Sequence, residues 1–311
     1  MKRPQNIIAE SGLTLPTAVV YGLGIWLLKG LIPHQLWLQM VAFFLTVYMM
    51  VEMSNSNALL RVRSRMVSST FVILSCAASF LFPSLPGNLM QVGVVGALLL
   101  LFHTYQDSYA TGKIYFAFLF WGLSTLAFPQ LFFFVPLIWL LMATQLRSLN
   151  LRTVLASILG LATPYWFVFS WSLFKGDLSW LIAHFHSLSK IAWTSGYASL
   201  TVGQLSVLVF TFLLTLVSIV HLWKYAFEDK TRIRLIYGFF TTLALVSTAY
   251  IFIVPLAFNQ IFRLVLISAS PIIAHFFTLT SHRFTNIFFF VTLALAVAIT
   301  ALNLCMPSLN F

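Results

Sequence analysis

The sequence predicts an all-α integral membrane protein, a helical bundle with about eleven transmembrane helices. Of its 311 residues, 60% are hydrophobic and only 7% are charged, whereas soluble domains are about 45–50% apolar and about 25% charged. So few polar side chains cannot cover a soluble surface, and lipid is therefore the expected solvent for most of the chain. Stretches such as 207–220 and 287–302 are apolar on nearly every side, which fits helices and excludes the alternating pattern of barrel strands.

Each transmembrane helix needs about 17–25 predominantly apolar residues, and this length divides the chain into eleven segments. The fifth and sixth segments are short and are separated only by residues 128–130, so they could form one hairpin that dips into the membrane, and ten or twelve spans are also compatible with the sequence. The predicted segments are 13–32, 36–53, 66–83, 88–104, 114–128, 131–146, 154–174, 203–223, 235–256, 261–280 and 285–305.

The positions of lysine and arginine set the predicted orientation. If the N-terminus is cytoplasmic, 13 of the 17 lysines and arginines lie on the cytoplasmic side, as the positive-inside rule requires. The other four, Lys29, Lys175, Lys190 and Arg263, lie outside. The sequence therefore predicts a multi-pass protein of the cell inner (plasma) membrane with an external C-terminus. The net charge of +11 then reflects topology and anionic headgroups, and no nucleic-acid partner is expected.

No repeat and no low-complexity linker divides the chain, so residues 1–311 are predicted to form a single membrane domain. No cleavage site of small residues follows the basic N-terminus, and we expect this segment to be retained rather than removed as a signal peptide. The most charged internal loop is 224–234.

The longest external loop, 176–202, is the main candidate for function. At about 100° per residue, its central part forms an amphipathic helix suited to the outer membrane surface, with Asp177 and His184 on one flank and His186 and Lys190 on the other. The helix is either a passive interfacial element or a cover over a substrate groove. In the second case Asp177, His184 and His186 are the candidate catalytic residues. The two histidines diverge by about 200° on a helix, so no shared metal is expected.

Cationic groups retained on the external face predict an anion-binding site. The candidate substrate-binding residues are Lys29, His34, Lys190 and Arg263. A phosphate or pyrophosphate on a polyprenyl-type lipid carrier would fit these groups through charge-assisted hydrogen bonds. Arg263 is the most specific of them, because an arginine near hydrocarbon is costly and either faces protein or water or extends to the interface.

On the internal side, Arg61, Arg63 and Arg65 precede the third span. They are either topology anchors with a possible ion pair or a site for an anionic headgroup or a protein partner. Two spans contain a proline, Pro164 and Pro271. Each proline marks either a simple kink or a broken helix that lines a substrate cavity, and His275 would lie on the same side of its helix as the second proline.

The motifs of several enzyme classes are absent. The chain has no Gly-rich phosphate loop, no His-Glu-x-x-His and no Gly-x-Ser-x-Gly. Its six carboxylates make an acidic metal site improbable, and its two cysteines, Cys76 and Cys305, lack metal-ligand spacing. No metal and no cofactor is therefore predicted.

The stretch Gly112–Gln130, followed by Leu131–Met142 and by Arg147, Arg152, Gly160 and Pro164, resembles the mid-chain of GT-C membrane glycosyltransferases. The whole chain also resembles uncharacterised polytopic inner-membrane proteins of bacteria. The first resemblance implies glycosyl transfer from a lipid-linked donor. GT-C enzymes typically carry an acid in the first external loop, and residues 29–35 contain none. The resemblance therefore implies the metal-free branch, which relies on histidine and arginine.

The leading functional prediction is the handling of a lipid-linked anionic substrate of the sugar-phosphate type at the external face, through GT-C-like glycosyl transfer. One alternative is a transporter or flippase that uses the proline-containing spans. The other is a non-catalytic membrane subunit of an envelope assembly complex, with membrane-protein partners bound through the internal basic loops.

Overall fold

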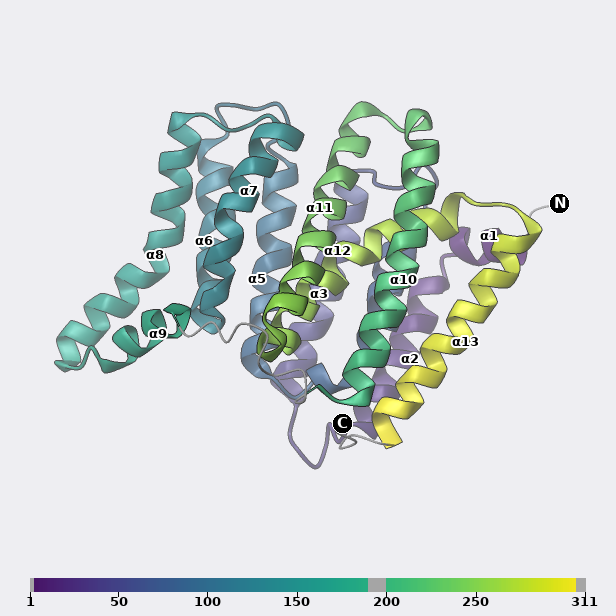
Figure 1. The fold of residues 1–311 in the computed structure, drawn as a ribbon, viewed down its shortest axis with the longest axis horizontal. Helices are drawn as coiled ribbons and strands as arrows, with labels where there is room; N and C mark the ends of the chain where they lie inside the picture. Colours follow the sequence, from purple (N-terminus) through teal and green to yellow (C-terminus); the bar gives the residue numbers. More distant parts are fainter. Residues whose placement is uncertain (1–2, 190–199, 306–311) are drawn as a thin grey trace. The chain divides into compact units, whose positions relative to one another are not determined.

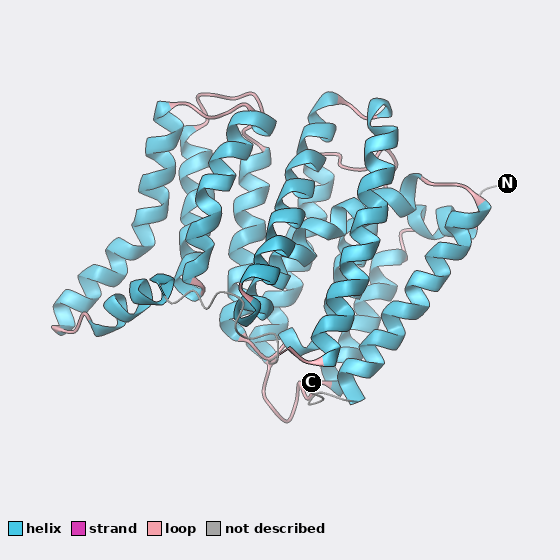
Figure 2. Cartoon of the chain, viewed as in Figure 1, coloured by secondary structure: helices cyan, strands magenta, loops and turns pink. Residues whose placement is uncertain are grey.

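The computed structural model describes residues 3–189 and 200–305 of the chain. Over these residues the secondary structure consists of helices joined by short loops, with no β-strand (Figures 1 and 2). The predicted all-α fold is therefore confirmed. Several of the helices are long and apolar enough to cross a bilayer, which indicates a membrane protein.

Each of the eleven predicted segments coincides with a helix. Among the described residues, eight helical stretches are long and apolar enough to cross a membrane, and a ninth results if the bent pair α1(Pro4–Glu10) and α2(Thr14–Leu28) forms one span. Helices α4(Met66–Ala77) and α6(Thr111–Ala127) are shorter. The count of eleven spans and the orientation of the termini stay predictions. The eight stretches are Trp37–Ser56, Leu85–Phe102, Pro129–Leu146, Leu151–Lys175, Val202–Glu228, Thr231–Ile253, Pro255–Leu279 and Arg283–Cys305.

The main helices of these stretches are α3(Trp37–Ser56), α5(Leu85–Phe102), α7(Val135–Leu141), α8(Leu151–Lys175), α10(Val202–Tyr225), α11(Thr231–Ile253), α12(Phe258–Leu279) and α13(Arg283–Cys305). The single membrane domain stays a prediction, and within it the contacts form two compact units. Unit 1 comprises residues 1–85 and 194–311, and unit 2 comprises residues 86–193.

Helix α12 forms the centre of unit 1, where it packs against α4, α10 and α11. All of its residues from Ile261 to Thr278 are buried. The helix continues through Pro271, and α8 of unit 2 continues through Pro164. Neither proline interrupts its helix, so the broken spans that motivated the transporter alternative are not present.

Loops predicted to share a side of the membrane meet at the same end of unit 1. The loop after α3 contacts α11, since Arg232 donates to Asn57 and the Tyr237 hydroxyl donates to the Leu59 carbonyl. At the opposite end, Gln204 donates to Asn259. We call the end that carries residues 57–65 and 224–234 the basic end of unit 1.

In unit 2, glycines let neighbouring helices approach closely. A Cβ added at Gly160 of α8 would lie 2.2 Å from the Tyr115 carbonyl oxygen of α6, and one added at Gly93 of α5 would lie 2.1 Å from the Ser124 hydroxyl of α6. Small residues at such crossings are typical of membrane helix pairs.

Candidate functional site

A buried ionic cluster lies at the basic end of unit 1. The Asp229 carboxylate accepts a hydrogen bond from Nε2 of His275 at 3.0 Å and one from Nε of Arg61 at 2.7 Å. The side chains of His275 and Asp229 are only 1% and 2% exposed. Arg61 also pairs with Glu228. Each oxygen of this buried carboxylate therefore has a hydrogen-bond donor.

Three separate segments build this cluster. Helix α10 ends in a short 3₁₀ turn, Ala226–Glu228, and the Asp229 amide closes that turn on the Ala226 carbonyl at 3.2 Å. This places the carboxylate beside the last turns of α12, which carry His275. Arg61 arrives from the loop between α3 and α4. The cluster thus joins residues that are 46 and 168 positions apart in the sequence.

The carboxylate determines which imidazole nitrogen of His275 carries a proton. A carboxylate only accepts, so Nε2 is the donor and, in the neutral ring, Nδ1 holds the free lone pair. Nδ1 of His275 is buried and has no hydrogen-bond partner within the described residues, and the same holds for Nδ1 of His221 on α10. The centroids of these two rings are 6.1 Å apart. Buried, unpaired imidazole nitrogens are costly unless a ligand or a proton uses them.

Hydrogen bonds and neighbouring charges set the protonation states of Asp229 and Arg61. Burial raises the pKa of the Asp229 carboxyl, but the hydrogen bonds from His275 and Arg61 outweigh it and leave that pKa below its ordinary value. The hydrogen bond with Asp229 raises the pKa of Arg61. Asp229 is therefore ionised and Arg61 is charged at neutral pH.

The lowered pKa of Asp229 predicts a loss of stability in acid. A group whose pKa is depressed on folding stabilises the protein above its unfolded pKa, about 3.9 for aspartate, and loses that contribution as the pH falls through its folded pKa. We expect the thermal stability of the wild type to exceed that of Asp229→Asn at pH 7 and the difference to shrink below about pH 4. Thermal unfolding in nanodiscs between pH 7 and pH 3 measures it, and a constant difference would contradict the assignment.

A pocket of about 230 Å³ opens beside the cluster. Polar groups from the ends of α10 and α12, from the start of α13 and from the loop residue Arg61 line it, together with two apolar residues. The lining residues are Arg61, His221, Tyr225, Glu228, His275, Phe276, Leu279, Thr280, Ser281, His282 and Thr285. We call this the polar pocket. It combines three imidazoles with the Glu228 carboxylate and the Arg61 guanidinium, which is paired with Glu228 and Asp229. The imidazoles are therefore the groups that can bind an anionic group and accept or donate a proton. Within the described part of the chain, no group of three or more His, Cys, Asp or Glu residues is arranged to hold a metal.

The candidate site residues that are predicted to lie on the external face are divided between the two units. In unit 1, Lys29 caps the end of α2, and burial lowers its pKa. His34 is exposed, and its ring packs over Gly30, whose φ is +90°. Arg263 is 2% exposed and donates to the Leu81 carbonyl. It therefore faces protein and does not extend to the membrane interface.

The other predicted residues belong to unit 2 and to a part of the chain that is not described. Asp177 is exposed and accepts a hydrogen bond from the Ser179 amide at 2.8 Å, which lowers its pKa. The donor, Ser179, is the first residue of α9(Ser179–Ser189). His186 is exposed. Lys190 lies outside the described residues, as do Trp193 and Tyr197 of the predicted amphipathic segment.

His184 is the best-positioned of the external candidates. Its Nε2 lies 3.0 Å from the Tyr165 hydroxyl of α8, and its ring stacks on Trp180 with centroids 4.8 Å apart. Burial lowers the pKa of His184. Tyr165 in turn donates to Thr125 of α6, so these hydrogen bonds link α9 to α8 and α6.

Beside α9, an apolar groove of about 470 Å³ runs along α8. Leu181 and Phe185 of α9 and Tyr165, Trp166 and Phe169 of α8 are among its lining residues. Two residues of the segment 176–202 therefore line this groove, whereas Asp177, His184 and His186 are not among its lining residues.

Comparisons with protein-family models, with curated proteins and with solved structures found no match to this chain.

Sequence reasoning does not identify the ionic cluster beside the polar pocket. It does not select Asp229, it offers Arg61 only as an anchor or as a site for a headgroup or a protein partner, and it places His275 only beside Pro271. One signal was available, because Glu228 and Asp229 are two of only six acidic residues and interrupt an otherwise basic loop.

Proposed function

We propose that this chain is an inner-membrane protein that binds a lipid-linked anionic substrate of the sugar-phosphate type in the polar pocket. In that pocket a side chain of the protein takes up a proton during the reaction of the substrate. One observation carries the proposal. A buried imidazole, His275, is oriented by a carboxylate and lines a pocket that also contains a guanidinium and two further histidines. Carboxylate-oriented imidazoles with a free nitrogen are typical general bases.

In a glycosyl transfer, the acceptor hydroxyl would give its proton to Nδ1 of His275 as its oxygen forms the bond to the sugar carbon. The bond from that carbon to the phosphate oxygen would break, and the phosphate would leave with the electron pair. His282, which lines the same pocket, would stabilise the departing negative charge. Asp229 would act as a positioning residue that fixes the tautomer of His275.

The proposal predicts selective binding of a phosphate headgroup. We expect farnesyl phosphate to bind the protein in phosphatidylcholine nanodiscs more tightly than farnesol does. His275→Asn and His282→Gln are each expected to weaken farnesyl phosphate binding by about tenfold, since a hydrogen bond to a charged group contributes about 1.5–3 kcal/mol. Equilibrium binding of the two radiolabelled probes measures this.

Arg63→Gln is the matched control, because Arg63 is an exposed cation of the same basic end that does not line the pocket. It should leave the phosphate preference unchanged. Equal binding of farnesol and farnesyl phosphate, or an equal loss in Arg63→Gln, would refute the proposal.

A second candidate function places the same chemistry at the predicted external face, and the groove between α8 and α9 favours it. In this case a gene carrying His184→Ala would fail to restore an envelope-glycan phenotype in a deletion strain although the protein level is normal, whereas one carrying His275→Asn would restore it. If the polar pocket is the site, His275→Asn would fail to restore the phenotype and His184→Ala would restore it.

A further inference from the structure

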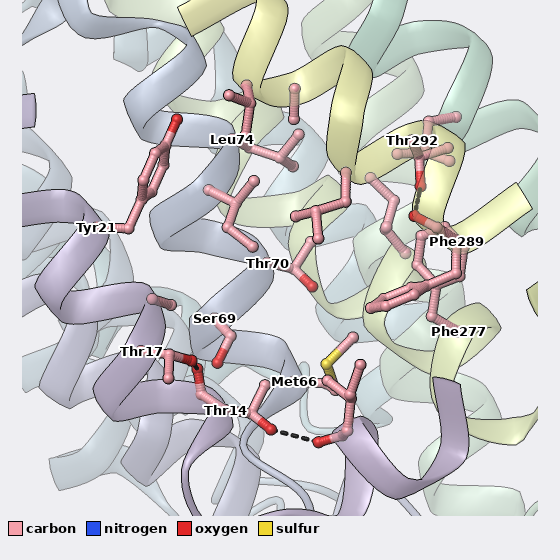
Figure 3. Close-up of a pocket in the computed structure, with 18 of the residues that line it drawn as sticks. Thr14, Thr17, Tyr21, Met66, Ser69, Thr70, Leu74, Phe277, Phe289 and Thr292 are labelled. Atoms are coloured by element: carbon pink, nitrogen blue, oxygen red, sulfur yellow. Dashed lines mark hydrogen bonds between the residues drawn. The ribbon is translucent and has the colours of Figure 1, made fainter. Parts of the chain in front are cut away.

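A second cavity in unit 1 is an apolar groove between α2 and α13, with a volume of about 330 Å³ (Figure 3). Its floor is formed by α4 and α12, through residues such as Thr70, Leu74 and Phe277. Tyr21 lines the groove, and its hydroxyl donates a hydrogen bond to Thr300 of α13 at 2.9 Å. Ile8 of α1 also lines the groove. We call this cavity the α2–α13 groove.

Small side chains on the facing helices create this space. Ala18 of α2 and Ala296 of α13 are buried against the groove, and Ser69 and Thr70 contribute from α4. Several hydroxyls at the groove are engaged within the protein, since Ser69 donates to the Arg65 carbonyl, Thr17 to the Thr14 carbonyl and Thr292 to the Phe289 carbonyl. The groove therefore presents hydrocarbon to its occupant, and an apolar ligand fits it best.

The polar pocket and the α2–α13 groove are separate cavities that follow one another along one face of α13. Thr285 lines the polar pocket, and Phe289, one helical turn further on, lines the groove. Thr292 and Ala296 continue the same stripe, because side chains three and four positions apart share a helix face. The stripe from Thr285 to Ala296 spans about 16 Å at 1.5 Å per residue.

We infer that the α2–α13 groove receives the hydrocarbon chain of the ligand whose anionic head occupies the polar pocket. The inference rests on the proposed function and names its substrate class as a single amphiphile, an anionic headgroup on a linear or isoprenoid chain. The chain enters sideways from the bilayer between α2 and α13, and the head stays at the basic end of unit 1. The basic surroundings complement a negative headgroup.

The first test maps the chain on the wild-type protein. A farnesol analogue that carries a diazirine, photolysed in phosphatidylcholine nanodiscs, should label peptides of α4 around residues 69–74 and of α13 around residues 292–297. Unlabelled farnesyl phosphate should compete for these sites. Uniform labelling of the outward-facing residues, including Val20 and Val291, would show bulk lipid contact only and would overturn the inference.

The second test fills the groove. Ala18→Trp and Ala296→Trp are expected to weaken the binding of farnesol and of farnesyl phosphate by about tenfold or more, because the displaced apolar contact is worth at least one buried side chain. Val20→Trp and Val291→Trp are matched controls, since these residues are 69% and 48% exposed on the same two helices and do not line the groove. The controls should bind both probes normally.

The two probes separate this inference from the proposed function. If groove filling leaves farnesol labelling unchanged while His282→Gln still removes the preference for phosphate, the groove assignment fails and the proposed function stands. If groove filling removes farnesol labelling and no phosphate preference exists, the groove assignment stands and the proposed function fails. Ala296→Leu is a smaller change that should give a partial loss if the tryptophan variants do not fold.

Discussion

Replacing Asp229 with alanine is expected to lower the free energy of unfolding by about 3–5 kcal/mol, the usual cost of removing one partner from a buried ion pair. The substitution leaves the His275 imidazole, whose side chain is 1% exposed, without its acceptor, and it removes one acceptor of the Arg61 guanidinium, whose side chain is 30% exposed. It also releases the contact between the loop after α3 and the end of α10. Unfolding in nanodiscs or mixed micelles, followed by circular dichroism, measures the loss.

Glu228→Ala is the matched control for this prediction. Glu228 is the neighbouring acid and pairs with the same arginine, but its side chain is 41% exposed. An exposed pair of this kind contributes about 0–1 kcal/mol. Equal losses in the two variants would mean that Asp229 is not a buried partner in solution. A double-mutant cycle with Arg61→Gln would then show near-zero coupling for both acids.

Replacing Gly160 with alanine is expected to force α6 and α8 apart. The new Cβ would lie 2.2 Å from the Tyr115 carbonyl oxygen and 3.1 Å from the Leu119 amide nitrogen, and these backbone atoms cannot move aside as a flexible side chain would. Overpacking of this kind costs about 1–3 kcal/mol, and we expect the upper end because the obstacle is backbone. Thermal unfolding, read from the tryptophans of unit 2, should show a lower transition.

Gly24→Ala is expected to change the stability in the opposite direction. Gly24 lies within α2, and no heavy atom lies within 4 Å of a Cβ added there. Alanine at an unobstructed helix position stabilises by about 0.8–1.0 kcal/mol relative to glycine. If Gly160→Ala were as stable as Gly24→Ala, the close approach of α6 to α8 would be wrong.

The sequence could predict the helices because the relevant signal is local. A run of apolar residues long enough for the bilayer must satisfy its backbone internally, so each predicted segment became a helix. The segment at 66–83 shows the limit of this reasoning. Its α-helix stops at Ala77, and a 3₁₀ turn, Ser79–Leu81, follows. Composition alone does not contain that boundary, because the residues on both sides of it are apolar.

The candidate site was harder to predict, because its members are ordinary when considered singly. Arg61 fits the positive-inside pattern, Asp229 fits a charged loop, and His275 fits a helix end. Their contact depends on the path of α12 through unit 1 and on the turn after α10, which are set by packing rather than by any spacing in the sequence. The prolines left two alternatives open for the same reason, and only the structure shows that α12 continues as one helix through Pro271.

The sequence by itself determined that this protein is helical, that it belongs in a membrane and where its apolar segments lie, because lipid solvation depends on the length and polarity of each segment alone. Only the tertiary structure decided that Asp229, His275 and Arg61 meet, and that a polar pocket and an apolar groove share one face of α13. Those features arise from contacts between distant segments, whose free energies depend on geometry that no local pattern records.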